Sequence, residues 1–440
     1  MGESVDLCVH NATILTMNPK DPVVENGYLC VKGETIHNLG KGNPGAYEAA
    51  KSIDAQGGLV LPGLINGHTH APMTLFRGLA DDLPLMDWLN HYIFPVERNM
   101  DADFVKVGSL LACAEMILSG TTTFCDMYLF EEQVAEAAKD AGMRCLVGEV
   151  LYDFPSPNYG TLENGFKYTE AMIQRWAHDP LVSVAVEPHS LFTCSPDLLR
   201  TADALARKYQ VPLILHLAET REEVKQVQER YGKSPIEHLN ELGLLHNNLI
   251  ADHCVHLSPR DLDMLAERGV RVVHNPESNM KLASGIAPVP AMLKKGITVG
   301  LGTDGCASNN NLDLFAEMDS TAKLHKVNSM DPTVMDAARV LKMTTIEGAK
   351  ALGMEEQIGS LESGKKADFI VLDLDSPHLI PMYNPYSHIV YSARGNDVRH
   401  SVINGKLVME DRRLLTLDLE EILAKAKEKA ALVKKWVGMS

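Results

Sequence analysis

From residue 59 onward the chain alternates short apolar segments with helical ones, and this alternation is the strongest constraint on its fold. Eight apolar runs occur, at 59–66, 122–127, 144–151, 182–188, 212–219, 249–255, 271–276 and 298–305. Nearly continuous apolar runs fit strands that are buried on both faces of a parallel sheet. Several of the helical segments between them begin near Asp or Ser and end at Gly, as helix caps require. Eight strand–helix units over roughly 250 residues predict an α/β fold, a (β/α)8 (TIM) barrel.

The two ends of the chain have a different pattern. Residues 5–57 contain short strand-like runs broken by turns, and the tail from residue 359 does the same. Each end is too short to bury a robust core alone. We therefore expect residues 1–57 and 359–420 to pair in one small β-sandwich domain beside a barrel formed by residues 58–358. Residues 421–440 have apolar positions at helical spacing and predict a C-terminal helix.

The charge balance limits the classes of partner. The 440-residue chain has 58 acidic and 41 basic residues, a net charge of −17, which opposes nonspecific binding to nucleic acid or to anionic membranes. It has no apolar run of about 18 residues that would span a membrane, and its start lacks the features of a secretory signal. The eight cysteines are scattered, which favours reduced thiols in a cytoplasmic protein. The sequence leaves open whether the chain acts alone or as a homo-oligomer.

The first apolar run leads into two histidines, His68 and His70, separated by one threonine. Residues i and i+2 of a strand project to the same face, so both imidazoles can reach one point. In a barrel of this kind, catalytic groups come from the carboxyl ends of the strands. Four further strand ends have groups that bind metals or transfer protons: His189, His216 with Glu219, His253 and Asp304. So many such groups at independent strand ends favour a metal site.

The residue types predict how such a site works. A nitrogen and oxygen donor set is available from three imidazoles and one carboxylate: His68, His70, His216 and Asp304. This set suits Zn²⁺, with Fe²⁺ as the alternative, and a water in the remaining position loses a proton near neutral pH. Glu219 is then free to shuttle a proton, and His253 can orient the attacking hydroxide. The ends of the third and fourth predicted strands (144–151 and 182–188) have no lysine that could become a carbamate bridging two metals. This favours one ion per subunit.

Each of these residues also has a structural interpretation. A histidine in an apolar strand, such as His216, can be a hydrogen-bonded core residue, and Asp304 in "TDG" can be a turn aspartate. His189 can be a structural hydrogen-bonding residue, and Glu97 can be a solvated glutamate at the start of a helix. The grouping at strand ends favours the metal site over these alternatives. We treat three further histidines as structural or surface residues and leave one asparagine without an assignment: His246, His256, His274 and Asn275.

Several motifs resemble those of the amidohydrolase superfamily, and the resemblance spans nearly the whole chain. The motifs are "PGLINGHTH" (62–70), "HLAE" (216–219), "DHCVHL" (252–257) and "GTDG" (302–305). The segment "LFRGLADDLPLMDWLNHYIFPVE" (75–97) is similar to the deaminases that act on 5′-methylthioadenosine and S-adenosylhomocysteine. The segments "GSLESGKKADFIVLDL" (359–374) and "DVRHSVINGKLV" (397–408) are also typical of this branch.

The resemblance implies a metal-dependent aminohydrolase of the adenosine deaminase type. It gives the metal ligands as His68, His70, His216 and Asp304. Protonated Glu219 would donate to N1 of adenine while a metal-activated hydroxide attacks C6, and Asp304 would pass the proton of the water to the departing amino group. His253 would stabilise the hydroxide, and the products are ammonia and the inosine analogue. The substrate contacts would be Glu97 with the ribose, His189, and Trp88 in a covering loop.

The preferred nucleoside stays open. A homocysteine carboxylate calls for a cation after the third strand, yet residues 152–170 contain no arginine and only Lys167. The related substrates 5′-deoxyadenosine and adenosine also fit such a pocket. Other hypotheses are a deaminase of a free base such as guanine or an oxidised purine, a triazine-type chlorohydrolase, and a catalytically inactive binding protein. Glu97 argues against a ribose-free substrate, and the complete ligand set argues against an inactive protein.

Overall fold

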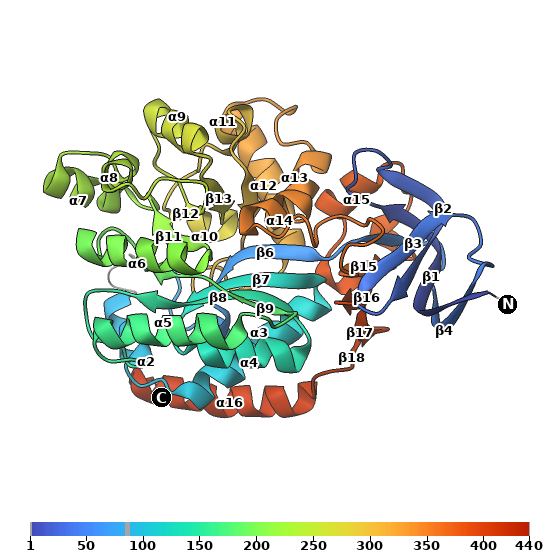
Figure 1. Cartoon of the computed structure of the whole chain (residues 1–440), viewed down its shortest axis with the longest axis horizontal. Helices are drawn as coiled ribbons and strands as arrows, with labels where there is room; N and C mark the ends of the chain where they lie inside the picture. Colours follow the sequence, from blue (N-terminus) through green and yellow to red (C-terminus); the bar gives the residue numbers. More distant parts are fainter. Residues whose placement is uncertain (1, 84–88, 440) are drawn as a thin grey trace.

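The computed structural model describes residues 2–83 and 89–439, and its centre is a barrel of parallel strands (Figure 1). One run of strands has the order β6, β7, β8 and then β9 and β10, and a second has the order β11 to β14. Parallel bridges from Val186 to Leu213 and from Ser190 to His216 join the two runs. On the other side, the Asp304 amide donates to the His68 carbonyl over 3.0 Å. The predicted (β/α)8 barrel is therefore confirmed.

The barrel strands and the helices that cover them have the following bounds. The strands are β6 (Leu64–Thr69), β7 (Thr121–Tyr128), β8 (Arg144–Leu151), β9 (Val182–Val184), β10 (Glu187–Pro188), β11 (Leu213–Leu217), β12 (Leu249–His253), β13 (Arg271–His274) and β14 (Val299–Leu301). The helices are η1 (Ala71–Phe76), η2 (Leu89–Ile93), α2 (Phe94–Glu97), α3 (Ala102–Leu118), α4 (Glu131–Ala141), α5 (Leu162–Trp176), α6 (Pro196–Tyr209), α7 (Arg221–Tyr231), α8 (Pro235–Leu242), α9 (Pro259–Arg268), α10 (Pro276–Lys281), α11 (Val289–Lys294), α12 (Leu314–Ser329), α13 (Ala337–Met343) and α14 (Ile346–Leu352).

Both chain ends contribute to a second, nine-stranded sheet beside the barrel (Figure 1). Its strands are β1 (Glu3–Leu15), β2 (Val23–Lys32), β3 (Thr35–Lys41), β4 (Tyr47–Asp54), β5 (Leu59–Pro62), β15 (Phe369–Leu372), β16 (Val398–Ile403), β17 (Lys406–Glu410) and β18 (Arg413–Leu414). The N-terminal and C-terminal segments meet where β5 pairs antiparallel with β15. The arrangement of this sheet as a sandwich and the domain boundaries stay predictions.

The strand expected over residues 59–66 is two strands in two sheets. Leu59–Pro62 forms β5 and pairs with β1 and β15, whereas the barrel begins at β6. Gly63 separates them, and a Cβ there would lie 2.0 Å from the Thr122 hydroxyl oxygen on β7. Only a residue without a side chain allows the backbone to pass so close. Because both strands are fully buried, the apolar run continues across the boundary and hides it.

The last helix packs against the barrel helix α3. This helix, α16 (Leu419–Trp436), starts two residues before the expected segment, because the Asp418 carboxylate accepts from the Glu421 amide as an N-cap over 3.0 Å. The Trp436 ring lies 5.5 Å from the Phe104 ring on α3, between centroids. The remaining helices are η3 (Pro377–Leu379), α15 (Pro385–Tyr391) and η4 (Gly395–Asp397). Over residues 2–83 and 89–439, no helix has the length and apolar character needed to cross a bilayer.

Candidate active site

Four imidazoles and one carboxylate converge at the carboxyl end of the barrel. The ring centroid of His68 lies 4.8 Å from that of His70 and 4.9 Å from that of His216. Asp304 Oδ1 lies 3.1 Å from His70 Nε2 and 3.7 Å from His68 Nε2. Two triads share His68, namely His68–His216–His253 and His68–His70–Asp304, and within each the potential ligand atoms lie within 4.8 Å of one another. The sequence-predicted ligands thus lie together, and the His253 ring is beside them, 5.5 Å from the His68 ring between centroids.

Backbone carbonyls orient two of the imidazoles. Nδ1 of His70 contacts the Met127 carbonyl, and Nδ1 of His216 lies 2.9 Å from the His189 carbonyl. A neutral imidazole that donates from Nδ1 keeps its Nε2 lone pair for a metal. His68 is fully buried, and its Nε2 has no hydrogen-bond partner among the described residues. This orphaned nitrogen, in a set of imidazoles and one carboxylate, fits a divalent metal such as zinc.

Two hydrogen bonds hold the Asp304 carboxylate in place. Ser278 donates its hydroxyl to Oδ2 over 2.6 Å, and the Gly305 amide donates to Oδ1 over 2.7 Å. Asp304 has a φ of +61°, a left-handed conformation that persists only where the surroundings fix it. Burial alone would raise the pKa of this carboxyl, but the hydrogen bond to His70 and the surrounding imidazoles hold it well below its usual range. Asp304 is therefore an anion before any metal binds.

His253 reaches the site through an irregular backbone. Its Nε2 lies 4.0 Å from Asp304 Oδ2, and its Nδ1 lies 2.9 Å from Asn279 Oδ1. Strand alternation would turn Asp252 and His253 to opposite faces. The φ of +70° at His253 interrupts this alternation, and both side chains contact residues of the site. Because Nδ1 of His253 pairs with Asn279, its Nε2 faces the centre of the side-chain cluster.

Glu219 lies at the rim of the cluster, two residues beyond the end of β11. Its side chain is half-buried, and its Oε1 lies 3.4 Å from the Ser284 hydroxyl. The carboxylate of Glu223 accepts from the backbone amides of Glu219 and Ala218 over 2.8 and 3.1 Å. Burial raises the pKa of Glu223 to about 7, against these opposing hydrogen bonds. Glu223 fixes the backbone, so the Glu219 carboxyl is free to contact a substrate.

A second carboxyl group stands on the other side of the cluster. Glu97 ends α2 and accepts from the Tyr128 hydroxyl over 2.8 Å, and the Tyr128 ring lies 5.9 Å from the His70 ring. Burial raises the pKa of Glu97, and the Tyr128 hydrogen bond opposes this. A carboxylate in this position can accept from two adjacent hydroxyls.

His189 and Trp88 complete the residues predicted from the sequence. The His189 ring lies 4.9 Å from the His216 ring, and its Nδ1 lies 2.9 Å from the Thr193 hydroxyl. Burial lowers the pKa of His189 to about 3, so it is a neutral group next to the proposed ligands. Trp88 lies outside the described residues.

The structure adds residues that the sequence interpretation missed. They are Tyr128, Asp252, Ser278 and Asn279, which contact Glu97, His68, Asp304 and His253 respectively. Ser278 and Asn279 follow β13 within "HNPESN", and polar residues after a barrel strand are a usable signal. Asp252 is a charged residue inside the apolar run "LIADHCV", which is an equally clear signal.

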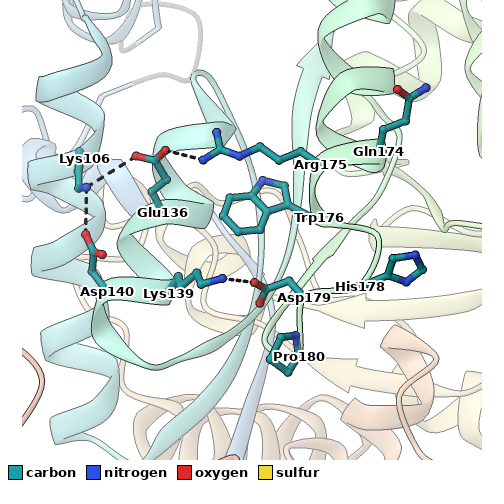
Figure 2. Close-up of a pocket in the computed structure, with 10 residues that line it drawn as sticks. All are labelled: Lys106, Glu136, Lys139, Asp140, Gln174, Arg175, Trp176, His178, Asp179 and Pro180. Atoms are coloured by element: carbon teal, nitrogen blue, oxygen red, sulfur yellow. Dashed lines mark hydrogen bonds and ion pairs between the residues drawn. The ribbon is translucent and has the colours of Figure 1, made fainter.

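A surface pocket of about 530 Å³ lies apart from this site (Figure 2). Lys106 lies 3.0 Å from Asp140, Arg175 lies 3.0 Å from Glu136, and Lys139 pairs with a carboxylate of the same pocket. Each of the cations drawn in Figure 2 therefore meets a carboxylate. The pocket contains none of the residues predicted to be functional, and we interpret it as a surface ion-pair network.

Comparison with known proteins agrees with this geometry. Residues 59–408 match the model of the Amidohydrolase family. A 5-methylthioadenosine/S-adenosylhomocysteine deaminase from Syntrophobacter fumaroxidans is 58% identical, over 99% of this chain and 100% of its own. A 5′-deoxyadenosine deaminase from Methanosarcina mazei is 44% identical, over 97% of this chain and 98% of its own.

The similarity extends to solved structures. An adenosine deaminase from Xanthomonas campestris with bound zinc superposes with a TM-score of 0.96 at 37% identity, over 99% of this chain and 100% of that one. A zinc-bound atrazine chlorohydrolase from Arthrobacter aurescens has a TM-score of 0.89 at 22% identity, over 96% of this chain and 100% of its own, and shares the fold alone. The family match, the relatives and the shared fold together show that the chain belongs to the amidohydrolase family.

Proposed function

We propose that this protein hydrolytically deaminates 5′-modified adenosines, with water replacing the 6-amino group and ammonia as the second product. The observation that carries the proposal is the position of Glu97, a carboxyl suited to a ribose diol, next to a cluster of metal-binding groups. Full-length relatives named for 5′-methylthioadenosine, S-adenosylhomocysteine and 5′-deoxyadenosine support it. The test is ammonia release by the zinc-loaded protein from a panel of adenosines and free bases.

The residues that would hold the metal are those at three strand ends: His68, His70, His216 and Asp304. We propose one Zn²⁺ per subunit, with Fe²⁺ as the alternative. When bound, the ion would lower the pKa of a water molecule so that a hydroxide is available near neutral pH. The zinc in the related Xanthomonas campestris structure supports this choice.

The chain's own groups carry the proton transfers. Glu219 donates a proton to N1 of adenine, which makes C6 electrophilic. Asp304 accepts the proton that the attacking water loses and returns it to the departing amino group. His253, fixed through Asn279, aligns the attacking oxygen. As the C6 carbonyl forms, the proton left on the C6 oxygen returns to Glu219. One water is therefore consumed, and the inosine analogue and ammonia are formed.

Glu97 is expected to discriminate nucleosides from free bases. Replacing Glu97 by alanine removes two acceptors for the ribose hydroxyls, and each hydrogen bond to a charged group contributes roughly 1.5–3 kcal/mol. We expect kcat/KM for adenosines to fall by at least about 10–100-fold, the value for one such hydrogen bond. An equal fractional loss on adenine and on its nucleosides would argue against the ribose contact. Kinetics of ammonia release on both substrates provide the measurement.

We expect the protein to prefer adenosines whose 5′ substituent is uncharged. In the described segment 152–170 after β8, the only cation is Lys167, an exposed residue that pairs with Glu163 over 2.6 Å. The other charged group at the start of this segment is Asp153, which accepts from the Ser195 hydroxyl over 3.2 Å. We expect kcat/KM for 5′-methylthioadenosine to exceed that for S-adenosylhomocysteine by about tenfold or more, the contribution of one charge-assisted contact. Equal values on both nucleosides would show that a cation is supplied from elsewhere.

We also propose a two-domain organisation for this enzyme. Residues 1–57 and 359–420, together with β5, would form a β-sandwich domain beside the barrel. His189 and Trp88 would contact the nucleoside, the latter from a covering loop. The net charge of −17 and the buried free cysteines support a cytoplasmic protein that binds neither nucleic acid nor anionic membranes.

A further inference from the structure

Asp252 occupies the same layer of the barrel as the proposed metal ligands. On neighbouring strands, Asp252 of β12 is the direct pairing partner of His216 of β11. Parallel partners project to the same face, so the Asp252 carboxylate points toward the barrel centre beside His216. There its Oδ2 lies 3.2 Å from Nδ1 of His68. The Asp252 carboxylate therefore contacts Nδ1 of His68, the ring nitrogen opposite the one proposed to bind the metal.

The contact between Asp252 and His68 is fully buried from solvent. Both side chains have 0% exposure. Neither oxygen of Asp252 and neither ring nitrogen of His68 has a hydrogen-bond partner among the described residues. An unpaired buried carboxylate is costly, and Nδ1 of His68 is the donor that lies within ion-pair distance. Donation from Nδ1 to Asp252 would satisfy both groups and leave Nε2 of His68 facing His70 and Asp304.

His68 differs in this respect from the other proposed histidine ligands. His70 and His216 contact neutral backbone carbonyls through Nδ1, whereas His68 faces a carboxylate. A carboxylate behind a ligating imidazole fixes its tautomer and increases its basicity, and so strengthens the bond to the metal. We propose that Asp252 is a positioning residue that orients His68 and increases the metal affinity of the site. This inference rests on the proposed metal site.

The substitution Asp252→Asn tests the inference, because the amide oxygen still accepts from Nδ1 while the charge is lost. We expect the dissociation constant for Zn²⁺, measured by competition with a chromogenic chelator, to rise by about 10–100-fold. The visible absorption spectrum of the Co²⁺-loaded protein should also change, since the ligand field depends on His68. The melting temperature of the metal-free protein should stay within a few degrees of wild type.

Glu187→Gln is the matched control. Glu187 is also fully buried and lies on the barrel strand β10, but no contact joins it to His68 among the described residues. Burial and the nearby Asp252 charge raise the pKa of Glu187 well above its usual range, and glutamine keeps the size and shape of its side chain. The Zn²⁺ dissociation constant and the Co²⁺ spectrum of this variant should match those of wild type.

The outcomes separate this inference from the proposed function. A wild-type Zn²⁺ dissociation constant and Co²⁺ spectrum in Asp252→Asn would overturn the role of Asp252 and leave the metal site intact. Failure of the wild-type protein to bind Zn²⁺ or Co²⁺ would overturn both. Should Asp252→Asn fail to fold, Asp252→Ser is the second variant, with the same expected loss of affinity and the same overturning result.

Discussion

Replacing Glu219 by glutamine is expected to lower kcat for 5′-methylthioadenosine by about 10²–10⁴-fold, the usual contribution of a positioned general acid or base. Glutamine has the shape of the carboxyl group but cannot transfer its proton to N1 of adenine. Metal content and melting temperature should be unchanged, because Glu223 holds the Glu219 backbone through the main-chain amide and not through the side chain. Steady-state ammonia release, metal analysis and thermal unfolding of the same preparation give the three readouts.

Glu222→Gln provides the matched control for this variant. Glu222 lies three residues away in the first turn of α7, and its side chain is exposed. The same chemical change at this position should leave kcat at the wild-type value. If Glu219→Gln retains wild-type turnover, Glu219 has no part in the proton transfer and another group must protonate the purine.

Replacing His216 by alanine is expected to abolish both metal binding and turnover. His216 is the proposed ligand that β11 contributes, and its Nδ1 is already committed to the His189 carbonyl. Without it, the proposed donor set falls from four to three. Those three, His68, His70 and Asp304, all come from the neighbouring ends of β6 and β14, so the β11 side of the ion would have no protein ligand. Elemental analysis should give one zinc per wild-type chain and a strongly substoichiometric amount in the variant, with ammonia release lost in parallel.

Two further histidine variants make this result specific. His178→Ala changes an exposed histidine of the surface pocket in Figure 2 and should keep full metal content and activity. His253→Gln should keep the metal while losing turnover, if His253 aligns the attacking oxygen as proposed. Because His253 lies as close to His68 as a ligand would, loss of metal from His253→Gln would instead make it a ligand. Retention of one zinc by His216→Ala would contradict the proposed ligand set.

The barrel could be predicted from the sequence because each of its strands is a short apolar run between capped helices. The boundary between β5 and β6 could not be predicted from the sequence. Leu59–Pro62 is as apolar as a barrel strand, and one of its two partners in the outer sheet is Phe369–Leu372, more than three hundred residues along the chain. Local periodicity contains no information on such a pairing. Gly63 was the one local indication, and its meaning depends on the approach of Thr122.

The convergence of the proposed ligands could likewise be predicted, because the carboxyl ends of parallel strands share one end of a barrel. The contacts behind those ligands were not. His253 reaches the site through a positive φ, and a period-two pattern would send its side chain the other way. The charge of Asp252 within an apolar strand indicates that it needs a partner, but that partner, His68, lies on another strand and the local sequence does not identify it. The partners of Asp304 and Glu97 depend on loop conformation.

The pairing of β5 with β15 also affects how the chain is made. During translation β5 leaves the ribosome with its apolar edge bare, and the strand that covers this edge follows roughly 300 residues later, on the order of 15–60 s at common synthesis rates. An uncovered strand edge is a template for association between nascent chains. The delay between the synthesis of β5 and that of β15 is therefore the interval in which association between newly made chains competes with folding.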